Sequence, residues 1–517
     1  MRSTGLIATA LVLGAGLVAA PAMAQPKTVL NVGMASADAG KLDPHLSATT
    51  PDKALFQWMF NGLVRFKPGS MNIELLEPDL AESWEASSDR KSWVFALRHG
   101  VQCHQGYGEL TSADVVYSLQ RSADPKRSSF SSDYKDFAAV EADGPYTVKI
   151  TLKNAVPSLL GLVANYHGGN IVCKKAAEEL GENFATKPIG TGPFAFQELK
   201  SKEATILAAN KQYFRGAPKL ERIVYRYIPS DASRDLAYQS GEIDMLYGTQ
   251  SDTWVERMKQ LPNTEVMVFE PAELTLLSIN VTKPPLDNIK VRQAIAHAIN
   301  RKEIVKFNGT QVSRAGKSIV PIGYLGFSED VPLLPYDVNK AKELLKEAGY
   351  PNGLTIKMIQ TNLPGMLRSM EVVQAQLRRA GITLEFDVVE HATFHANIRK
   401  DLSPLVDYAA ARFPVADTYL TQFFHSASIV MTPTAVTNFS HCNMADQEIE
   451  QARSEPDVAK QKALWKTAQQ KLMSAVCAVP MHEALLVWAR RSNLDLGYKL
   501  EGALSLGPPV IETTQFR

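Results

Sequence analysis

The segment 187–194, with the sequence Lys-Pro-Ile-Gly-Thr-Gly-Pro-Phe, restricts the fold more than any other part of the chain. Gly190 and Gly192 permit either a positive φ or a close approach of two backbone segments. Pro188 and Pro193 fix φ and cannot donate a hydrogen bond to a sheet. A strand-like apolar run follows directly. The segment therefore predicts a point where the chain crosses between lobes, and not a site of chemistry.

Length and composition indicate a globular protein with several lobes. The chain has 517 residues, too many for one ordinary core, so two or three lobes are expected. Apolar residues make up 45% and charged residues 21%, which excludes a disordered chain and a polytopic membrane protein. The 55 basic and 54 acidic residues nearly cancel, so neither nucleic acid nor an anionic membrane is expected as a partner.

The first 24 residues have the pattern of a signal peptide. Arg2 supplies the positive end, residues 6–20 form an apolar run, and Ala-Met-Ala at 22–24 is a cleavage motif. The run is short and Pro21 follows it, which argues against an uncleaved membrane anchor. No cysteine lies near the cleavage motif, so a lipid anchor is not expected. We therefore predict a periplasmic protein that is not inserted in the membrane.

Four cysteines would meet an oxidising compartment after export. They are Cys103, Cys173, Cys442 and Cys477. Four cysteines allow three connectivities, and sequence separation favours Cys103–Cys173 with Cys442–Cys477 without excluding the other two. No Cys-x-x-Cys motif occurs, so neither a redox centre nor a zinc ribbon is expected. The sequence predicts no cofactor.

Motifs along most of the chain resemble those of one protein family. Besides Gly-Thr-Gly-Pro-Phe at 190–194, they are Leu-Asp-Pro-His at 42–45, Pro-Asp-Leu-Ala-Glu-Ser-Trp at 78–84, Trp-Val-Phe-Ala-Leu-Arg-His-Gly-Val at 93–101, Leu-Thr-Ser-Ala-Asp-Val-Val-Tyr-Ser-Leu at 110–119, Gly-Glu-Ile-Asp at 241–244 and Lys-Pro-Pro-Leu-Asp at 283–287. Together they resemble the extracytoplasmic solute-binding proteins of the dipeptide, oligopeptide and nickel ABC importers, solute-binding family 5.

The resemblance implies a mixed α/β fold of the periplasmic binding protein type, with three lobes and a ligand cleft between lobes one and three. The implied boundaries are 25–59, 181–271 and 490–517 for lobe one, 60–180 for an inserted lobe two, and 272–489 for lobe three. Lobe two is strand-rich and is expected to be self-contained. In lobe three, strands at 354–358 and 384–388 alternate with helices, which predicts a parallel sheet. Local signals place helix starts at Thr111 or Ser112, at Asp287 or Asn288, and at Asp337.

The resemblance also implies a carrier and not an enzyme. Two lobes joined by crossing strands would close over a small-molecule or peptide ligand. The closed complex, expected to be a monomer, would then deliver the ligand to the inner-membrane permease subunits of an ABC importer. A peptide or a peptide-like small solute is the main prediction for the ligand.

The segment 407–420 resembles the part of the family that lines the ligand cleft. In dipeptide-binding relatives it runs roughly Gly-Trp-Thr-Gly-Asp-x-Gly-Asp-Pro-Asp, and its first Asp pairs with the α-ammonium of the peptide. Arg412 occupies that place here, Ala409 replaces the Trp, and Asp417 matches the last Asp. An arginine has donors but no acceptor, so it cannot receive an ammonium group but can hold a carboxylate or a phosphate. An anionic or acylated ligand is therefore expected.

Five further side chains are candidate ligand contacts. Arg368 falls near the arginine that dipeptide-binding relatives place against the ligand's carboxylate, although it or Arg412 could instead form an ion pair at the surface or between lobes. The other candidates are Phe413 and Tyr419, as a stacking wall or as core residues, and Thr49 and Thr50, as hydrogen-bond donors to ligand or as plain turn residues.

Three alternative functions stay open. A non-peptide anionic solute, such as an opine-like compound or a phosphorylated sugar, would suit the arginines. A carrier of a metal or metallophore would need ligands from His391, His395, His425 or His441. A secreted hydrolase is supported only by Ser505, whose surroundings lack the first glycine of the nucleophile-elbow motif.

Overall fold

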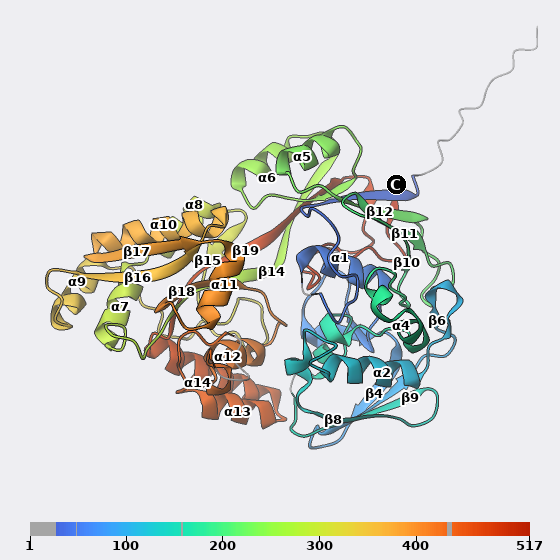
Figure 1. Cartoon of the computed structure of the whole chain (residues 1–517), viewed down its shortest axis with the longest axis horizontal. Coiled ribbons are helices and arrows are strands. Elements are labelled where there is room, and N and C mark those ends of the chain that lie inside the picture. The colour runs from blue at the N-terminus through green and yellow to red at the C-terminus, as the bar shows by residue number, and fades with distance from the viewer. Residues whose placement is uncertain (1–26, 48, 157–158, 432–436) are drawn as a thin grey trace, which may run out of the picture.

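The structure is a computed structural model that describes residues 27–47, 49–156, 159–431 and 437–517. The expected signal peptide, 1–24, lies outside the described residues. Within the described ranges, no helix is both long and apolar enough to cross a membrane. The chain folds into two halves, one mostly blue to green and the other mostly yellow-green to orange-red, and the red C-terminal end returns to the first half (Figure 1).

A nine-stranded sheet runs through both halves. Its order is β10 (Phe194–Lys200), β11 (Ala204–Ala209), β12 (Arg222–Tyr227), β1 (Val29–Met34), β13 (Met245–Tyr247), β19 (Ala478–Arg491), β14 (Thr264–Ile279) and β18 (Leu405–Ala410), and β15 (Ser313–Ala315) also pairs with β19. β1 is parallel to β12 and β13, whereas β14, β18 and β19 pair in antiparallel fashion. The sheet therefore links elements that are far apart in the sequence.

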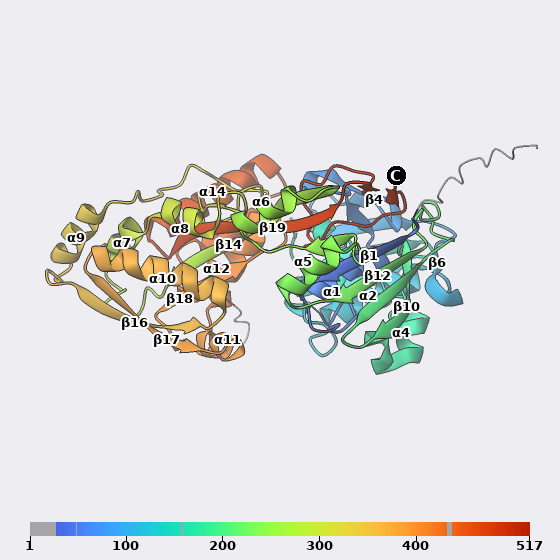
Figure 2. The ribbon, with the colours of Figure 1, turned by 90° about the horizontal axis from the view of Figure 1, so that it is seen from above.

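The long strands β14 and β19 connect the two halves (Figure 2). β14 pairs through residues 264–269 with 486–491, and then through 273–278 with 478–484. The register shifts between Phe269 and Glu273, which marks the crossing point. β19 passes through the crossing as one strand, and its pairing with residues 264–269 of β14 begins at Leu486.

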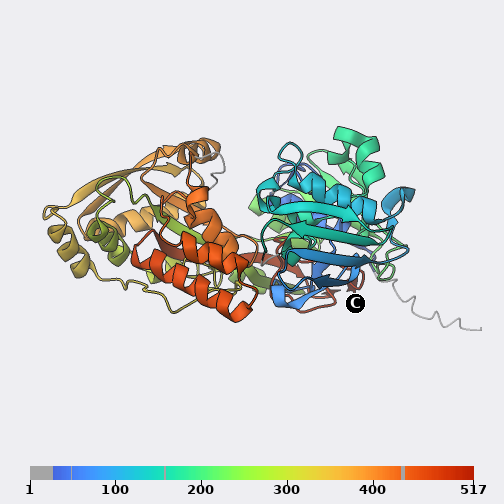
Figure 3. The ribbon, with the colours of Figure 1, turned by 90° about the horizontal axis from the view of Figure 1, so that it is seen from below.

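Lobe two contains a separate four-stranded antiparallel sheet covered by one helix (Figure 3). The strands are β4 (Ala81–Ala86), β5 (Ser92–Leu97), β9 (Thr147–Leu152) and β8 (Phe137–Ala142), and the helix is α2 (Ser112–Ala123). The predicted N-cap Thr111 is confirmed: its backbone N–H donates to the Asp114 carboxylate at 2.8 Å, and its hydroxyl lies in a reciprocal capping box. The helix ends at Asp124, before Pro125, as the sequence predicts.

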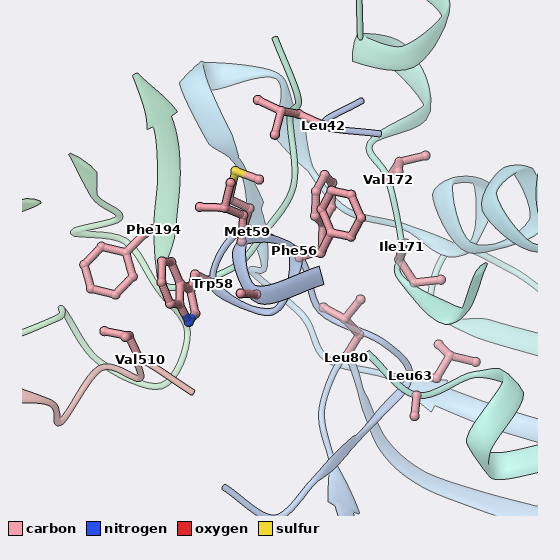
Figure 4. Packing of buried hydrophobic residues seen from close by; sticks show 14 of the residues in the cluster. Leu42, Phe56, Trp58, Met59, Leu63, Leu80, Ile171, Val172, Phe194 and Val510 are labelled. Atoms are coloured by element: carbon pink, nitrogen blue, oxygen red, sulfur yellow. The ribbon is translucent and has the colours of Figure 1, made fainter. Parts of the chain in front are cut away.

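Lobe two shares its hydrophobic core with lobe one, so the expectation of a self-contained lobe two is wrong. The helix α1 (Thr50–Met59) lies between the two and packs on both sides (Figure 4). Trp58 extends toward Phe194 and Val510 of lobe one, whereas Phe56 lies on the side of Val172 in lobe two (Figure 4). These side chains belong to one continuous buried cluster. The two lobes therefore form one rigid half, because separating them would expose this core to water.

The Gly-Thr-Gly-Pro segment passes along the end of α1. A Cβ added to Gly190 would lie 2.2 Å from the carbonyl oxygen of Met59, and one added to Gly192 would lie 2.5 Å from the Met59 carbonyl carbon. The Gly192 N–H donates to that same Met59 oxygen at 2.9 Å. Glycine is thus required at these two positions because two backbone segments approach closely, which is one of the two reasons that the sequence predicts. The chain then enters β10.

Lobe three is built around the crossing strands and a parallel pair, β16 (Leu354–Thr361) and β17 (Ile382–Val389). Its helices are α7 (Ile289–Ala298), α8 (Arg301–Asn308), α9 (Val338–Glu347), α10 (Pro364–Arg379), α11 (His391–Arg399), α12 (Ala416–Phe424), α13 (Asp446–Ser454) and α14 (Val458–Ser474). Two predicted caps are confirmed, since Asn288 accepts from the N–H of Lys290 and Asp337 from that of Lys340.

The remaining elements are short. In the first half they are β2 (Val64–Phe66), β3 (Leu76–Pro78), β6 (Gln102–Cys103), β7 (Gly108–Glu109), α3 (Leu159–Leu162), α4 (Lys174–Leu180), α5 (Asp231–Gln239), α6 (Asp252–Lys259), β20 (Leu494–Asp495) and β21 (Gln515–Phe516). The C-terminal strand β21 pairs with β20, so the chain ends on the first half (Figure 1).

Both favoured disulfides are confirmed. Cys103 bonds Cys173 with a Cα–Cα distance of 6.2 Å, and Cys442 bonds Cys477 with a distance of 6.1 Å. The first closes a loop within lobe two, and the second joins the start of β19 to the segment before α13.

Candidate ligand-binding site

Two neighbouring cavities lie along the crossing strands, and Glu273 and Ala409 line both of them. The small cavity, of about 160 Å³, lies between the halves and is lined by Lys53, Tyr166, Pro271, Glu273, Ala409, Ala410, Ala411, Arg412, Leu504 and Leu506. The large cavity, of about 680 Å³, extends into lobe three between the sheet, α10 and α11. The two cavities adjoin at these shared residues, and their combined size is of the kind expected for a small solute.

Three charged side chains meet in the small cavity. Lys53 comes from α1, Glu273 from β14, and Arg412 from the loop after β18. Among the described residues, none of the three forms a salt bridge within 4.0 Å. Burial, and secondly the charge of Arg412, lower the pKa of Lys53 to about 8, while Glu273 opposes this shift. Burial raises the pKa of Glu273, against the effect of Lys53 and Arg412. Two cations therefore face one carboxylate.

Arg412 is held by uncharged groups. Its Nε donates to Oε1 of Gln422 at 2.7 Å and its Nη1 donates to the Ala411 carbonyl at 3.1 Å. The guanidinium also lies 5.4 Å from the ring centre of Phe423, in cation–π contact. These contacts orient the side chain without neutralising its charge, so it can bind an anion at the cavity.

The floor of the large cavity is one face of the sheet. Residues two apart on a strand point to the same face, and the cavity is lined by Glu273 and Thr275 of β14, Asp407 and Ala409 of β18, His482 and Ala484 of β19, and Ser313 of β15. Oδ1 of Asp407, Nδ1 of His482 and Oγ of Ser313 have no hydrogen-bond partner within the described ranges. Burial raises the pKa of Asp407 to about 7 and lowers that of His482 to about 4. This floor is polar, and its histidine, His482, is uncharged at neutral pH.

Close to the small cavity, Phe413 joins lobe three to lobe two. Its ring centre lies 5.9 Å from that of Phe66 and 6.4 Å from that of Tyr166. A Cβ added to Gly161 would lie 1.7 Å from Cζ of Phe413. At the surface, Nζ of Lys462 lies 3.4 Å from Oε1 of Glu74 and adds a second contact between these lobes. The two halves therefore touch beside the cleft.

The remaining predicted site residues are dispersed. Arg368 on α10 is exposed, lines the large cavity and donates from Nε to the Pro364 carbonyl at 3.2 Å, so it does not share a cavity with Arg412. Oδ2 of Asp417 lies 3.5 Å from Nη2 of Arg453, and Asp417 lines neither cavity. Tyr419 is fully buried and donates its hydroxyl to the Ala410 carbonyl.

In the first half, Thr49 donates its hydroxyl to the Asp52 carboxylate at 2.9 Å. Thr50 begins α1, and its side chain lies outside the described part of the structure. Lys53 and Glu273 are not among the residues that the sequence predicts for the site. The available signal was that each is a charged residue within a largely apolar element, α1 for Lys53 and the buried part of β14 for Glu273.

Comparison with known proteins establishes the family. The sequence model of the bacterial extracellular solute-binding proteins, family 5, matches residues 76–430. The chain belongs to this family. Family 5 proteins are extracytoplasmic solute-binding components of ABC importers, so this chain is a transport protein and not an enzyme, and the expected mixed α/β periplasmic binding protein fold is confirmed.

Relatives in family 5 bind chemically different solutes. Heme-binding protein A of Haemophilus influenzae is 30% identical over 64% of this chain and 65% of its own length. Glutathione-binding protein GsiB of Escherichia coli K12 is 28% identical over 97% of this chain and 99% of its own. The solved structure of MoaA from A. tumefaciens R10 in complex with mannopinic acid is 49% identical, with a TM-score of 0.85 over 95% of this chain and 100% of that chain.

Of the residues that a metal carrier or a hydrolase would need, His391 and His395 line the large cavity, whereas Ser505 lines neither cavity. Nε2 of His391 and Nε2 of His395 lie 3.2 Å apart, but no cluster of three or more possible metal ligands occurs in the part of the chain that the structure describes. Ser505 is buried and donates to the Gly507 carbonyl at 3.1 Å.

Proposed function

We propose that this protein is the periplasmic binding component of an ABC importer for an acidic, opine-like solute. By this term we mean an amino acid whose nitrogen is alkylated by a sugar-derived unit, so that carboxylates, a secondary amine and hydroxyl groups follow one another along the molecule. The observation that carries the proposal is the placement of Lys53 and Arg412 in one small cavity between the halves, without an ion-pair partner in the described chain.

The two cations suit a carboxylate for complementary reasons. The guanidinium of Arg412 presents parallel N–H donors that match the two oxygens of a carboxylate, and the ammonium of Lys53 adds a compact charge. Both side chains are partly removed from water at the cavity, where a charge-assisted hydrogen bond is stronger than at the surface. The 49% identical relative solved with mannopinic acid supports the same class of solute.

The position of the cations also explains closure. Lys53 belongs to the first half and Arg412 to lobe three, so a solute that contacts both is bound fully only when the halves approach each other. Such a solute shifts the equilibrium toward the closed state by its greater affinity for that state. The register shift of β14 between Phe269 and Glu273 gives the crossing strands a place to bend.

The remaining parts of the proposal concern export and delivery. Cleavage after Ala24 would release the mature protein into the periplasm. There it would act as a monomer and hand its solute to the inner-membrane permease subunits of the importer.

Isothermal titration of the mature protein tests this function. We expect mannopinic acid to bind in the micromolar range or more tightly, and glutathione and simple dipeptides to bind more weakly. Arg412→Ala should reduce affinity for mannopinic acid by about 2–4 kcal/mol, because it removes one side of the charged contact. Arg378→Ala, which removes an exposed arginine of α10 in the same lobe, is the matched control and should leave affinity unchanged. Absence of mannopinic acid binding by the wild-type protein would contradict the proposal.

A peptide is the second candidate solute. The Glu273 carboxylate could receive the ammonium end of a short peptide, and Lys53 and Arg412 its carboxylate end. A peptide-like ligand would be favoured if dipeptides or glutathione bound the protein more tightly than mannopinic acid does, as measured by competition.

A further inference from the structure

Glu273 occupies the junction of the two cavities. It lies on β14 directly after the register shift that marks the crossing between the halves. It is half-buried and lines both cavities, which only one other residue, Ala409, also does in the described chain. A solute that extends from the small cavity into the large one must pass this carboxylate.

The Glu273 carboxylate has no partner of its own. Within the described ranges, it forms no hydrogen bond and no ion pair within 4.0 Å, although Lys53 and Arg412 lie close enough to influence its charge. Partly buried carboxylates in native proteins are usually paired, because leaving such a charge without a partner is costly. An unpaired carboxylate at a ligand cavity therefore indicates a ligand group of opposite charge.

The side chain of Arg412 cannot bind a positively charged group of the solute, so another residue at the cavity must do so. Arg412 has hydrogen-bond donors but no acceptor atom, so it cannot receive a positively charged group. Glu273, on the neighbouring strand of the sheet, supplies a carboxylate at the edge of the same small cavity. Both the positive charge that would repel an amine and the negative charge that would bind it thus line the small cavity, but only the negative one also lines the large cavity.

We propose that Glu273 is the residue that recognises the amine of the solute and so fixes its direction in the cleft. This inference rests on the proposed function. The carboxylates lie in the small cavity against Lys53 and Arg412, the amine lies at Glu273, and the uncharged hydroxylated part lies on the polar floor of the large cavity near Thr275 and His482. The order of groups along an acidic opine matches the order of partners along the cleft.

An alternative role for Glu273 predicts a different result. If Glu273 served only to balance the charges of Lys53 and Arg412, its replacement by glutamine would alter the binding of every acidic solute in the same direction. If it recognises an amine, replacement would weaken only solutes that carry one. A solute without the amine would bind equally well or better, since a negative charge near its carboxylates has been removed.

Calorimetric titration of Glu273→Gln with two ligands separates these roles. The ligands are mannopinic acid and an analogue in which an ether oxygen replaces its secondary amine. For the wild-type protein we expect the ether to bind at least tenfold more weakly. For Glu273→Gln we expect mannopinic acid to lose ten- to one hundredfold in affinity and the ether to lose none, so that the difference between them closes.

An equal loss for both ligands would overturn the role of Glu273 while leaving the proposed function standing. Failure of the wild-type protein to bind either ligand would instead overturn the proposed function. Glu265→Gln, on the same strand but paired with Arg490 outside both cavities, is the matched control and should bind both ligands as the wild type does. Thermal melting of Glu273→Gln verifies that the variant is folded, and Glu273→Asp should restore part of the preference for the amine.

Discussion

Phe413 of lobe three occupies the space that any side chain at Gly161 of lobe two would need. Cζ of the phenyl ring lies 1.7 Å from the position of a Cβ added to Gly161. The neighbouring ring contacts, with Phe66 and Tyr166, also join residues of different lobes. These contacts join the two halves beside the small cavity, so they would be lost if the halves moved apart.

Gly161→Val should therefore oppose closure. The added atoms would collide with Phe413 in the closed arrangement but would meet no such obstacle when the halves are apart, so solute affinity should fall by about tenfold or more, since a clash of about 1–3 kcal/mol is typical of overpacking. Small-angle scattering with saturating solute should show a larger radius of gyration than for the wild type. Adding Phe413→Ala should restore part of the affinity, because it removes the obstacle; an unchanged affinity for the single variant would contradict the argument.

Solute affinity should also depend on the ionisation of Lys53. Burial and the charge of Arg412 lower its pKa to about 8 in the unliganded protein. A bound carboxylate favours the protonated ammonium and so raises this pKa. Affinity should then be constant below pH 8 and fall as the pH rises above 8, by up to about tenfold per pH unit.

Calorimetry between pH 6.5 and 9.5 measures this dependence. Lys53→Arg keeps a charge that persists throughout the range, so the fall above pH 8 should disappear, apart from the titration of the solute itself. Identical pH profiles for the two proteins would show that Lys53 does not contact the anionic part of the solute.

The buried carboxyl of Asp407 should make stability fall with rising pH. Burial raises its folded-state pKa to about 7, above the usual value of 3.8, and the hydrogen bond from Gln360 opposes the shift only in part. Between these values the folded protein keeps a proton that the unfolded chain releases. The stabilisation of the folded protein by this proton is therefore complete below about pH 4. It is lost as the pH rises through 7, at up to about 1.4 kcal/mol per pH unit.

Urea unfolding of Asp407→Asn at pH 5 and pH 8 tests this sign. The variant has no carboxyl to ionise, so its stability relative to the wild type should increase by about 2–3 kcal/mol from pH 5 to pH 8. Asp387→Asn removes an exposed carboxylate of β17 and should show no such change. An equal difference at the two pH values would mean that Asp407 is ionised in both.

Features set by neighbouring residues could be predicted from the sequence. The cap residues Thr111, Asn288 and Asp337 are recognised by hydrogen bonds that span two to three residues, and these helix starts are confirmed. The parallel pair of β16 and β17 follows in the same way from strand, helix and strand in succession. The disulfide pairing was favoured because loops closed over short separations are more probable than those closed over long ones.

Features set by long-range packing could not be predicted. Lys53, Glu273 and Arg412 lie more than a hundred residues apart, and only the sheet order and the crossing of β14 bring them to one cavity. The shared core of lobes one and two depends on which faces of α1 are buried, and its apolar residues gave no sign that two lobes would use both faces. Arg412 could be predicted as a cleft residue only because the family motif locates it.

The Leu-Asp-Pro-His motif ties lobe one to lobe two through a buried ion pair. Nη1 of Arg121, on α2, donates to Oδ1 of Asp43 at 2.9 Å, and its Nη2 contacts Oδ2. The ring of His45 lies against the same guanidinium, with 2.8 Å between Nδ1 and Nη1. Asp43 is 1% exposed and Arg121 8% exposed, so neither charge can be solvated if the other is removed.

Arg121→Met should therefore lower the free energy of unfolding by about 3–5 kcal/mol, since it leaves the Asp43 carboxylate buried without a partner. Adding Asp43→Asn removes that charge, so the double variant should be more stable than Arg121→Met alone. Arg226→Met, which breaks the exposed pair with Glu242, should cost no more than about 1 kcal/mol. Urea denaturation of the four proteins measures these differences. A cost of Arg121→Met as small as that of Arg226→Met would show that water reaches Asp43 and that the motif does not depend on a buried charge.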